Sequence, residues 1–214
     1  MQGKRYWNLD KILQTGIKDK TTYMVIWITG LSASGKTTLS KAFEKKYKSE
    51  IPNMVLLDGD VIRQLYGNDL GYEEADRAIQ IKRLHTLAAF LEEQSIVVLV
   101  AALYANEQLL QNNRNVFGEY FEVYLKADID QLKTREIKDL YKQALDKKIV
   151  NVVGVDIPWN EPVNPDLTFN IADGLTPDQM AELLYNSVFN KRTHGKTSNL
   201  IKAGSILRAG KNWH

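Results

Sequence analysis

The residues with the clearest chemistry form a loop that begins at Gly30. Residues 30–37 read Gly-Leu-Ser-Ala-Ser-Gly-Lys-Thr, a glycine and four residues followed by Gly-Lys-Thr. Glycines let the backbone turn its N–H groups onto phosphate oxygens, while the lysine reaches the β- and γ-phosphates and the threonine hydroxyl reaches Mg²⁺. The loop therefore predicts a site for ATP and Mg²⁺, with these phosphate contacts: Gly30, Ser32, Ala33, Ser34, Gly35, Lys36, Thr37 and Thr38.

A second reactive group is Asp58-Gly59-Asp60, with Arg63 one helical turn later. Two carboxylates beside a phosphate loop can support a metal–water shell and accept a proton from an attacking hydroxyl. We therefore predict Lys36, Asp58 and Asp60 as the catalytic residues. Without the phosphate loop, the same pattern would read as a turn whose carboxylates cap a helix.

The elements that position these motifs are those of an α/β protein. An apolar run over 23–28 predicts a buried strand before the loop, and an amphipathic helix follows Thr37. Further strands are predicted over 54–57, 95–103, 121–125 and 167–171. Helices are predicted over 75–94, 107–117, 128–146 and 177–189, the first with Ile79, Leu84, Leu87, Ala88 and Leu91 on one apolar face. The alternation predicts a parallel sheet with helices on both faces, and ligands bind at the carboxyl edge of such sheets.

Composition limits the classes of protein to consider. Hydrophobic residues make up 44% and charged residues 25% of the 214 residues, as in ordinary globular proteins. No apolar run approaches the roughly 20 residues of a membrane helix, and no signal peptide is recognisable. The chain has no cysteine, which excludes disulfides and cysteine nucleophiles. We expect a cytoplasmic protein that binds neither membranes nor nucleic acid.

Charge divides the chain into three parts. The net charge is only +2, but residues 1–22 carry five basic and two acidic residues, and residues 191–214 carry six basic residues and no acidic one. We predict an N-terminal extension (1–22), a kinase-like core (23–190) and a basic C-terminal tail (191–214). The basic ends either contact an anionic partner or another subunit, or are solvated tails.

A basic stretch lies between two late strands and holds Arg135, Lys138, Lys142, Lys147 and Lys148. Many nucleotide kinases have a helical lid at this place, where an arginine neutralises charge during phosphoryl transfer. The alternative is a solvated helix face. Arg77, at the start of the long helix, has the same two interpretations: it holds a substrate phosphate, or it is a surface residue.

Together these motifs resemble adenylylsulfate kinases. The resemblance is carried by the phosphate loop, by Leu-Asp-Gly-Asp-Val-Ile-Arg at 57–63, by Asp-Leu-Gly-Tyr leading to Ala-Asp-Arg at 69–77, and by Arg-Glu-Ile-Lys-Asp-Leu-Tyr-Lys at 135–142 with its continuation at 154–165. It runs from about Met24 to Phe189 and implies a P-loop kinase fold with a helical lid.

The resemblance also implies an activity and a set of roles. That family transfers the γ-phosphate of ATP to the ribose 3′-hydroxyl of adenylylsulfate, uses Mg²⁺ and is usually dimeric. By position, Asp60 would be the base, supported by Asp58, and Thr37 would serve Mg²⁺. The remaining implied contacts are Arg63 and Arg77 to the acceptor's phosphate, Tyr72 to its base, and Arg135 and Lys138 in the lid.

The departures from the family pattern concentrate on the acceptor side. An asparagine and paired arginines are replaced by Gln80, Lys82 and Arg83, and lysine lacks the planar fork of arginine. Tyr104 lies in the segment that replaces a Ser-Pro-aromatic-Arg sequence, and Val152 replaces a phenylalanine expected opposite Tyr72. We therefore count Gln80 and Tyr104 among the acceptor-binding residues.

Three functions stay open on the sequence alone. The first is an adenylylsulfate kinase. The second is a kinase of the same mechanism acting on a different nucleotide, such as the cytidine diphosphate-linked phosphoramidate used in bacterial capsule biosynthesis. The third is an inactive nucleotide-binding regulator, which would be expected to carry damage at Lys36, Asp60 or the lid.

Overall fold

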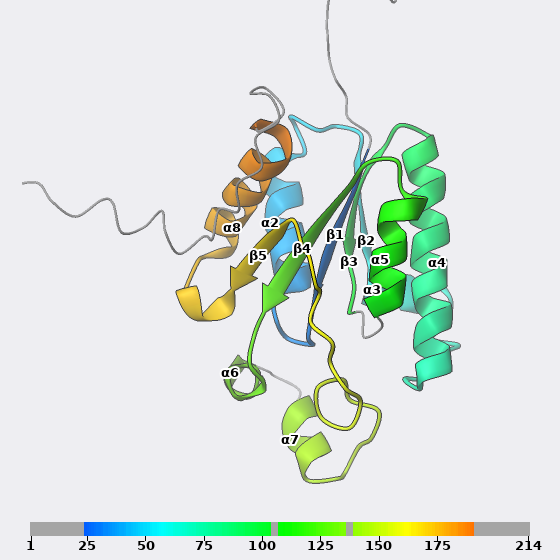
Figure 1. The fold of residues 1–214 in the computed structure, drawn as a ribbon, viewed down its shortest axis with the longest axis vertical. Helices are drawn as coiled ribbons and strands as arrows, with labels where there is room; N and C mark the ends of the chain where they lie inside the picture. The colour runs from blue at the N-terminus through cyan, green and yellow to red at the C-terminus, as the bar shows by residue number, and fades with distance from the viewer. Residues whose placement is uncertain (1–23, 104–106, 136–138, 191–214) are drawn as a thin grey trace, which may run out of the picture.

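The computed structural model describes residues 24–103, 107–135 and 139–190. The predicted extension and basic tail lie outside these residues, as do Tyr104 and Lys138. Five parallel strands form one sheet in the order β2-β3-β1-β4-β5 (Figure 1). The strands are β1 (Met24–Gly30), β2 (Met54–Asp58), β3 (Val97–Ala101), β4 (Tyr120–Lys126) and β5 (Leu167–Asn170). The predicted α/β fold with a parallel sheet is confirmed.

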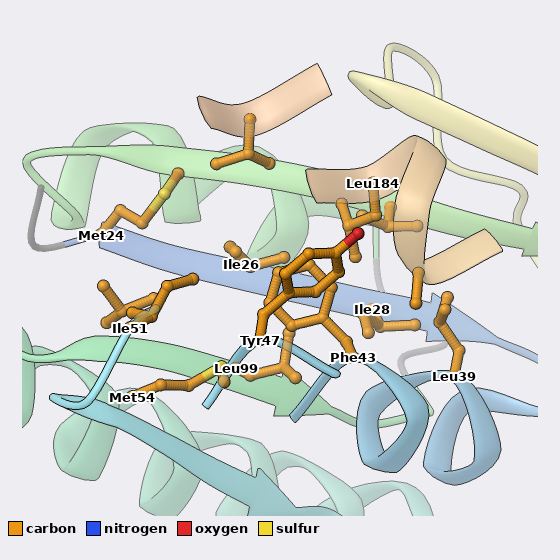
Figure 2. Packing of buried hydrophobic residues seen from close by; sticks show 14 of the residues in the cluster. Met24, Ile26, Ile28, Leu39, Phe43, Tyr47, Ile51, Met54, Leu99 and Leu184 are labelled. Carbon is orange, nitrogen blue, oxygen red and sulfur yellow. The ribbon is translucent and has the colours of Figure 1, made fainter. Parts of the chain in front are cut away.

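Helices cover both faces of the sheet, because each strand presents apolar side chains to both sides. Along β1 all seven residues are buried, as in the central strands of parallel sheets. The helices α2 (Lys36–Tyr47) and α8 (Pro177–Tyr185) cover one face, and α4 (Glu74–Glu93) and α5 (Glu107–Val116) cover the other (Figure 1). The apolar side chains between β1, α2 and α8 form a first buried cluster. Figure 2 shows Ile26 of β1, Phe43 of α2 and Leu184 of α8 in this cluster.

The second cluster joins Trp27 of β1 to α4 and corrects one expectation. Leu84 and Ala88 are buried as predicted, but Ile79 is 46% exposed, and Ile81 takes the buried place. Ile79 and Ile81 lie about 200° apart around the helix, so they cannot share a face. The prediction that Ile79 belongs to the apolar face was wrong, because the separation of five positions between Ile79 and Leu84 turns its side chain about 140° away from the buried face.

Shorter elements lie at or near the carboxyl edge of the sheet (Figure 1). They are α3 (Gly59–Leu65), α6 (Ile129–Arg135), α7 (Leu140–Leu145) and the 3₁₀ turn η1 (Ile171–Asp173), and a π-helical turn, η2 (Asn186–Asn190), follows α8. The stretch predicted as mostly helical over 128–146 thus forms two short helices on either side of 136–138. Among the described residues, no helix combines the length and the apolar character needed to cross a membrane.

A third apolar cluster lies beneath α6 and α7. It includes Leu31 of the phosphate loop, Leu132 of α6, Tyr141 of α7, and Val152 and Val153 of the following loop. The lid helices therefore do not stand apart from the core. They share buried contacts with the phosphate loop and with the segment that precedes β5.

Candidate active site

The phosphate loop has the backbone that its glycines predict. Gly30 has φ 152° and Gly35 has φ 99°, both in the region that side chains disfavour, and Ala33 between them is left-handed at φ 60°. A Cβ on Gly30 would lie 2.7 Å from both the Leu125 carbonyl oxygen and Ser34 Oγ. Only glycine fits there, between β4 and the turn of the loop.

Lys36 begins α2 and folds back over the loop. Its Nζ donates to the carbonyl oxygens of Gly30 at 3.0 Å and Leu31 at 2.7 Å. Burial lowers the pKa of Lys36 to about 8, although the nearby carboxylates of Asp60 and Asp58 act in the opposite direction. From this position the ammonium could donate to phosphate oxygens, which carry negative charge and would bind it more strongly than the two neutral carbonyls do.

Thr37 and Asp58 come together from two elements. Thr37 Oγ1 donates to Asp58 Oδ2 at 2.6 Å, across 21 residues of sequence. The other oxygen of Asp58 caps α3 by accepting from the backbone N–H groups of Asp60 at 2.9 Å and Val61 at 3.4 Å. Asp58 thus caps the helix, as the alternative interpretation predicts, and also lies at the phosphate loop, and its role toward the metal or the proton stays a prediction.

Asp60 lies in the first turn of α3 with its side chain exposed. It is close enough to Lys36 to act on the pKa of the lysine. Its position beyond the carboxyl end of β2 brings it beside the phosphate loop, as the sequence predicts. No group of three or more histidine, cysteine or acidic side chains with metal-binding spacing occurs in the described part of the chain.

Arg63 and Tyr72 form the acceptor side, but the arginine is engaged with the backbone. Arg63 is 9% exposed, and its Nη1 donates to the carbonyl oxygens of Leu70 and Gly71, each at 2.9 Å. Its guanidinium lies 4.9 Å from the centroid of the Tyr72 ring, which is 58% exposed. The guanidinium of Arg77 also lies over this ring, 5.7 Å from its centroid, so the two arginines hold the loop that presents the exposed Tyr72.

Arg77 ties this loop to the segment after the lid. Its Nε donates to the Tyr72 carbonyl at 2.7 Å and its Nη2 donates to the Asn151 carbonyl at 2.6 Å. Burial lowers the pKa of Arg77, and the charge of Arg63 acts in the same direction. Asp156 fixes the other side of that segment by accepting from the N–H groups of Asn151 at 2.5 Å and Val152 at 2.6 Å.

Gln80 lies beneath the Asp-Gly-Asp turn. Its side chain is 5% exposed, and its Nε2 donates to the Gly59 carbonyl at 2.9 Å, whereas its Oε1 has no partner among the described residues. A buried amide oxygen without a partner is costly unless a ligand or water satisfies it. The structure thus places Gln80 against the turn that holds the aspartates, and its predicted contact with the acceptor stays a prediction.

Two other departures change what the acceptor side offers. Arg83 makes a bidentate ion pair with Asp69, at 2.8 and 2.6 Å, and stacks on Tyr66, so it is directed away from the phosphate loop. Val152 is 5% exposed and belongs to the cluster under the lid. Among the described residues, no aromatic ring pairs with Tyr72.

The sequence reasoning missed two residues that organise the site. Tyr141 of α7 is fully buried and donates from its hydroxyl to the Ser32 carbonyl at 3.0 Å. Asp156, described above, was quoted only as part of a motif. The one sequence feature that could have found both residues is their position in the family-like segments 135–142 and 154–165. Arg135 ends α6, and the structure does not describe its side chain, so its predicted lid role stays a prediction.

Comparison with known proteins identifies the family. The family model for adenylylsulphate kinase matches residues 22–170, well over half of the chain. The chain belongs to the adenylylsulfate kinase family. It is accordingly an ATP-dependent kinase that acts on a nucleotide, as the resemblance implied.

Individual relatives in this family are named for different acceptors. The chain is 34% identical over 165 residues to the cytidine diphosphoramidate kinase of Campylobacter jejuni, covering 77% of this chain and 96% of that protein. It is also 34% identical over 144 residues to a probable adenylyl-sulfate kinase of Synechocystis, covering 67% and 81%. The structure resembles that of the Mycobacterium tuberculosis APS kinase CysC in complex with AMPPNP and APS, with a TM-score of 0.71, 30% identity and coverage of 77% and 96%.

Proposed function

We propose that this family member phosphorylates a nucleotide with a small base, a cytidine diphosphate-linked phosphoramidate, at a ribose hydroxyl. The observation that carries the proposal is that Tyr72, which is 58% exposed, has no second aromatic ring beside it among the described residues, while Val152 is buried where an opposing aromatic was expected. A single aromatic ring offers less stacking surface than a pair of rings. A pyrimidine base is smaller than adenine, so it loses less contact when the second ring is absent. The match to the cytidine diphosphoramidate kinase, which covers 96% of that protein, supports the same reading, and a probable adenylyl-sulfate kinase matches over a similar 163 residues.

For the donor half, we propose that the phosphate loop binds ATP with Mg²⁺. The hydroxyl of Thr37 and the carboxylate of Asp58, 2.6 Å apart, are hard oxygen donors of the kind that Mg²⁺ takes together with phosphate oxygens. When bound, the ion would neutralise charge on the phosphates. The backbone of the loop would hold the β- and γ-phosphates, and Lys36 would exchange its two carbonyl partners for phosphate oxygens.

The chemical step then needs only the residues already assembled. The acceptor's hydroxyl oxygen forms a bond to the γ-phosphorus, the bond from that phosphorus to the bridging oxygen breaks, and ADP leaves. Asp60 accepts the hydroxyl proton, and Lys36 stabilises the charge that develops on the phosphoryl oxygens. Arg77 and Arg63 position the acceptor through the Tyr72 loop, and Gln80 supports the Asp-Gly-Asp turn from below through the Gly59 carbonyl.

The second candidate acceptor is adenylylsulfate itself. It is favoured by the structural likeness to the M. tuberculosis relative in complex with APS, and by the several adenylyl-sulfate kinases among the relatives. In this case Tyr72 alone would have to stack on the adenine, unless residues outside the described part of the chain complete the pocket.

A coupled assay of ADP release, run with Mg-ATP and each acceptor in turn, tests the proposal. We expect turnover with the cytidine diphosphate-linked phosphoramidate and little or none with adenylylsulfate. Asp60→Asn should lower turnover much more than ATP binding, because the amide cannot accept the proton. Efficient turnover with adenylylsulfate and none with cytidine compounds would show that the acceptor assignment is wrong.

We also propose that the protein is a cytoplasmic homodimer. The support is the family's usual assembly and the location of ATP, the donor. Light scattering on the purified full-length chain should give twice the 24.4 kDa mass of the monomer. A mass equal to that of one chain would contradict the assembly.

A further inference from the structure

Tyr141 is a buried tyrosine whose hydroxyl reaches the phosphate loop from the lid. It lies in the first turn of α7, has no solvent exposure, and donates to the Ser32 carbonyl at 3.0 Å across 109 residues of sequence. The sequence motifs of the loop do not require this contact, because every glycine and the lysine fulfil their roles without it. It is a connection between two parts of the site that the chemistry does not explain.

The geometry of the peptide bond shows what this contact can do. The Ser32 carbonyl and the Ala33 N–H belong to one planar trans peptide, so the two groups point in opposite directions. Holding the carbonyl toward α7 therefore fixes the N–H on the other side. Ala33 is in the left-handed conformation, φ 60°, a strained state for alanine that surrounding contacts must maintain. Consecutive N–H groups in such a turn form an anion-binding concavity.

The surroundings of Tyr141 make its ring a fixed support. Leu31, next to Ser32, packs in the same cluster as Tyr141, Val152 and Val153. A Cβ on Gly154 would lie 3.2 Å from side-chain atoms of Leu31 and Ile129, so the segment after the lid closes tightly on the phosphate loop. The ring is held by packing, and the hydroxyl is the polar end that meets the loop.

We propose that Tyr141 is a positioning residue that sets the Ser32–Ala33 peptide in the orientation that binds the phosphates of ATP. The proposal rests on the assignment of the phosphate loop as the ATP site. The hydroxyl of Tyr141 acts through the backbone and does not contact the substrate. Specificity for phosphate thus depends on a lid residue as well as on the residues of the motif.

The test is Tyr141→Phe, which removes the hydroxyl and keeps the ring. We expect the Kd for Mg-ATP, measured by titration calorimetry, to rise about five- to tenfold, the typical effect of losing one neutral hydrogen bond. The KM for ATP should rise in parallel, while the KM for the acceptor should change less than twofold. A purely structural role would lower the melting temperature without this split between the two substrates.

The matched control is Tyr120→Phe, which removes another buried tyrosine hydroxyl. Tyr120 accepts from Asn113 at 2.9 Å and donates to Glu122 at 3.1 Å, near the amino end of β4 and away from the loop. It should lower the melting temperature and leave the Kd for Mg-ATP within twofold. An unchanged Kd in Tyr141→Phe, or an equal rise in both variants, would overturn the proposal. Absence of Mg-ATP binding by the wild type would refute the ATP site itself.

Discussion

Lys36 is the residue whose protonation should make ATP binding depend on pH. With a pKa of about 8, caused by burial, its ammonium loses a proton as the pH rises through 8. Phosphate binding favours the charged form, so the pKa in the complex is higher than in the free protein. Between these two pKa values the Kd for Mg-ATP should rise by up to about tenfold per pH unit, because the free protein must take up a proton to bind.

Calorimetric titrations from pH 7 to 9.5 measure this dependence. Lys36→Met should bind Mg-ATP weakly and with little change over the same range, and it should lower turnover by about 10²-fold or more. Lys41→Met, an exposed residue of the same helix, serves as the control. A wild-type Kd that stays flat, or a Lys36→Met variant with the same profile, would contradict the role of this lysine.

Tyr72 is the residue on which recognition of the acceptor base depends. Tyr72 is 58% exposed, and stacking of an exposed aromatic ring on a base contributes about 1–3 kcal/mol. Tyr72→Ala should raise the acceptor KM roughly 5- to 100-fold, while Tyr72→Phe should stay close to the wild type. The control is Tyr66→Ala, which removes an exposed ring that stacks on Arg83. Equal kinetics of Tyr72→Ala and the wild type would remove the stacking role.

At the scale of elements, the loop between α7 and β5 organises the acceptor side. Asp156 accepts from two consecutive backbone N–H groups, and the neighbouring Asn151 carbonyl receives Arg77. Asp156→Ala should release this turn, so the acceptor KM should increase severalfold, and the Kd for Mg-ATP should rise less, through the packing of the same segment on Leu31 of the phosphate loop. Steady-state kinetics with both substrates varied distinguish the two effects.

The control for this element is Asp178→Ala, which changes an exposed carboxylate in the first turn of α8. It should leave both kinetic constants unchanged. If Asp156→Ala weakened ATP and acceptor binding equally, the loop would serve the whole site, and the assignment to the acceptor side would be wrong.

The elements themselves were largely predictable, and the errors have physical causes. Residues 23–28 predicted β1 because continuous apolar runs identify central strands, and Thr176 predicted the start of α8, where it forms a capping box with Gln179. Ile79 was misplaced because several helical faces fit a sequence with apolar residues on more than one side. The left-handed backbone of Asp139, φ 49°, which precedes α7, has no glycine at its position to announce it.

The parts of the site in which a motif fixes the backbone were predictable. The hydrogen-bond partners of long side chains were less predictable. Lys36, Thr37 and Asp58 meet as expected, because a strand, a tight turn and a helix leave them little freedom. Arg63 and Arg77 instead bind backbone carbonyls, which no sequence pattern specifies. Tyr141 was missed because a contact across 109 residues depends on tertiary packing.

At the scale of the whole molecule, the sheet order places the site. From β1 the chain moves to β2 and β3 on one side and to β4 and β5 on the other, so the order reverses beside β1. Ligands of open parallel sheets bind at such a switch point, outside the carboxyl ends of the strands. The phosphate loop follows β1, and the aspartates follow β2, which places donor and acceptor groups on neighbouring parts of one edge.

The central claim is that this kinase keeps the family's donor half and has a changed acceptor half. The most direct measurement is a competition in one vessel: Mg-ATP with equal concentrations of adenylylsulfate and the cytidine diphosphate-linked phosphoramidate, with both phosphorylated products separated and quantified. The ratio of initial rates equals the ratio of the two kcat/KM values. We predict a ratio of at least about tenfold in favour of the cytidine compound, which corresponds to about 1.4 kcal/mol of difference in transition-state binding. A ratio that favours adenylylsulfate would contradict the account.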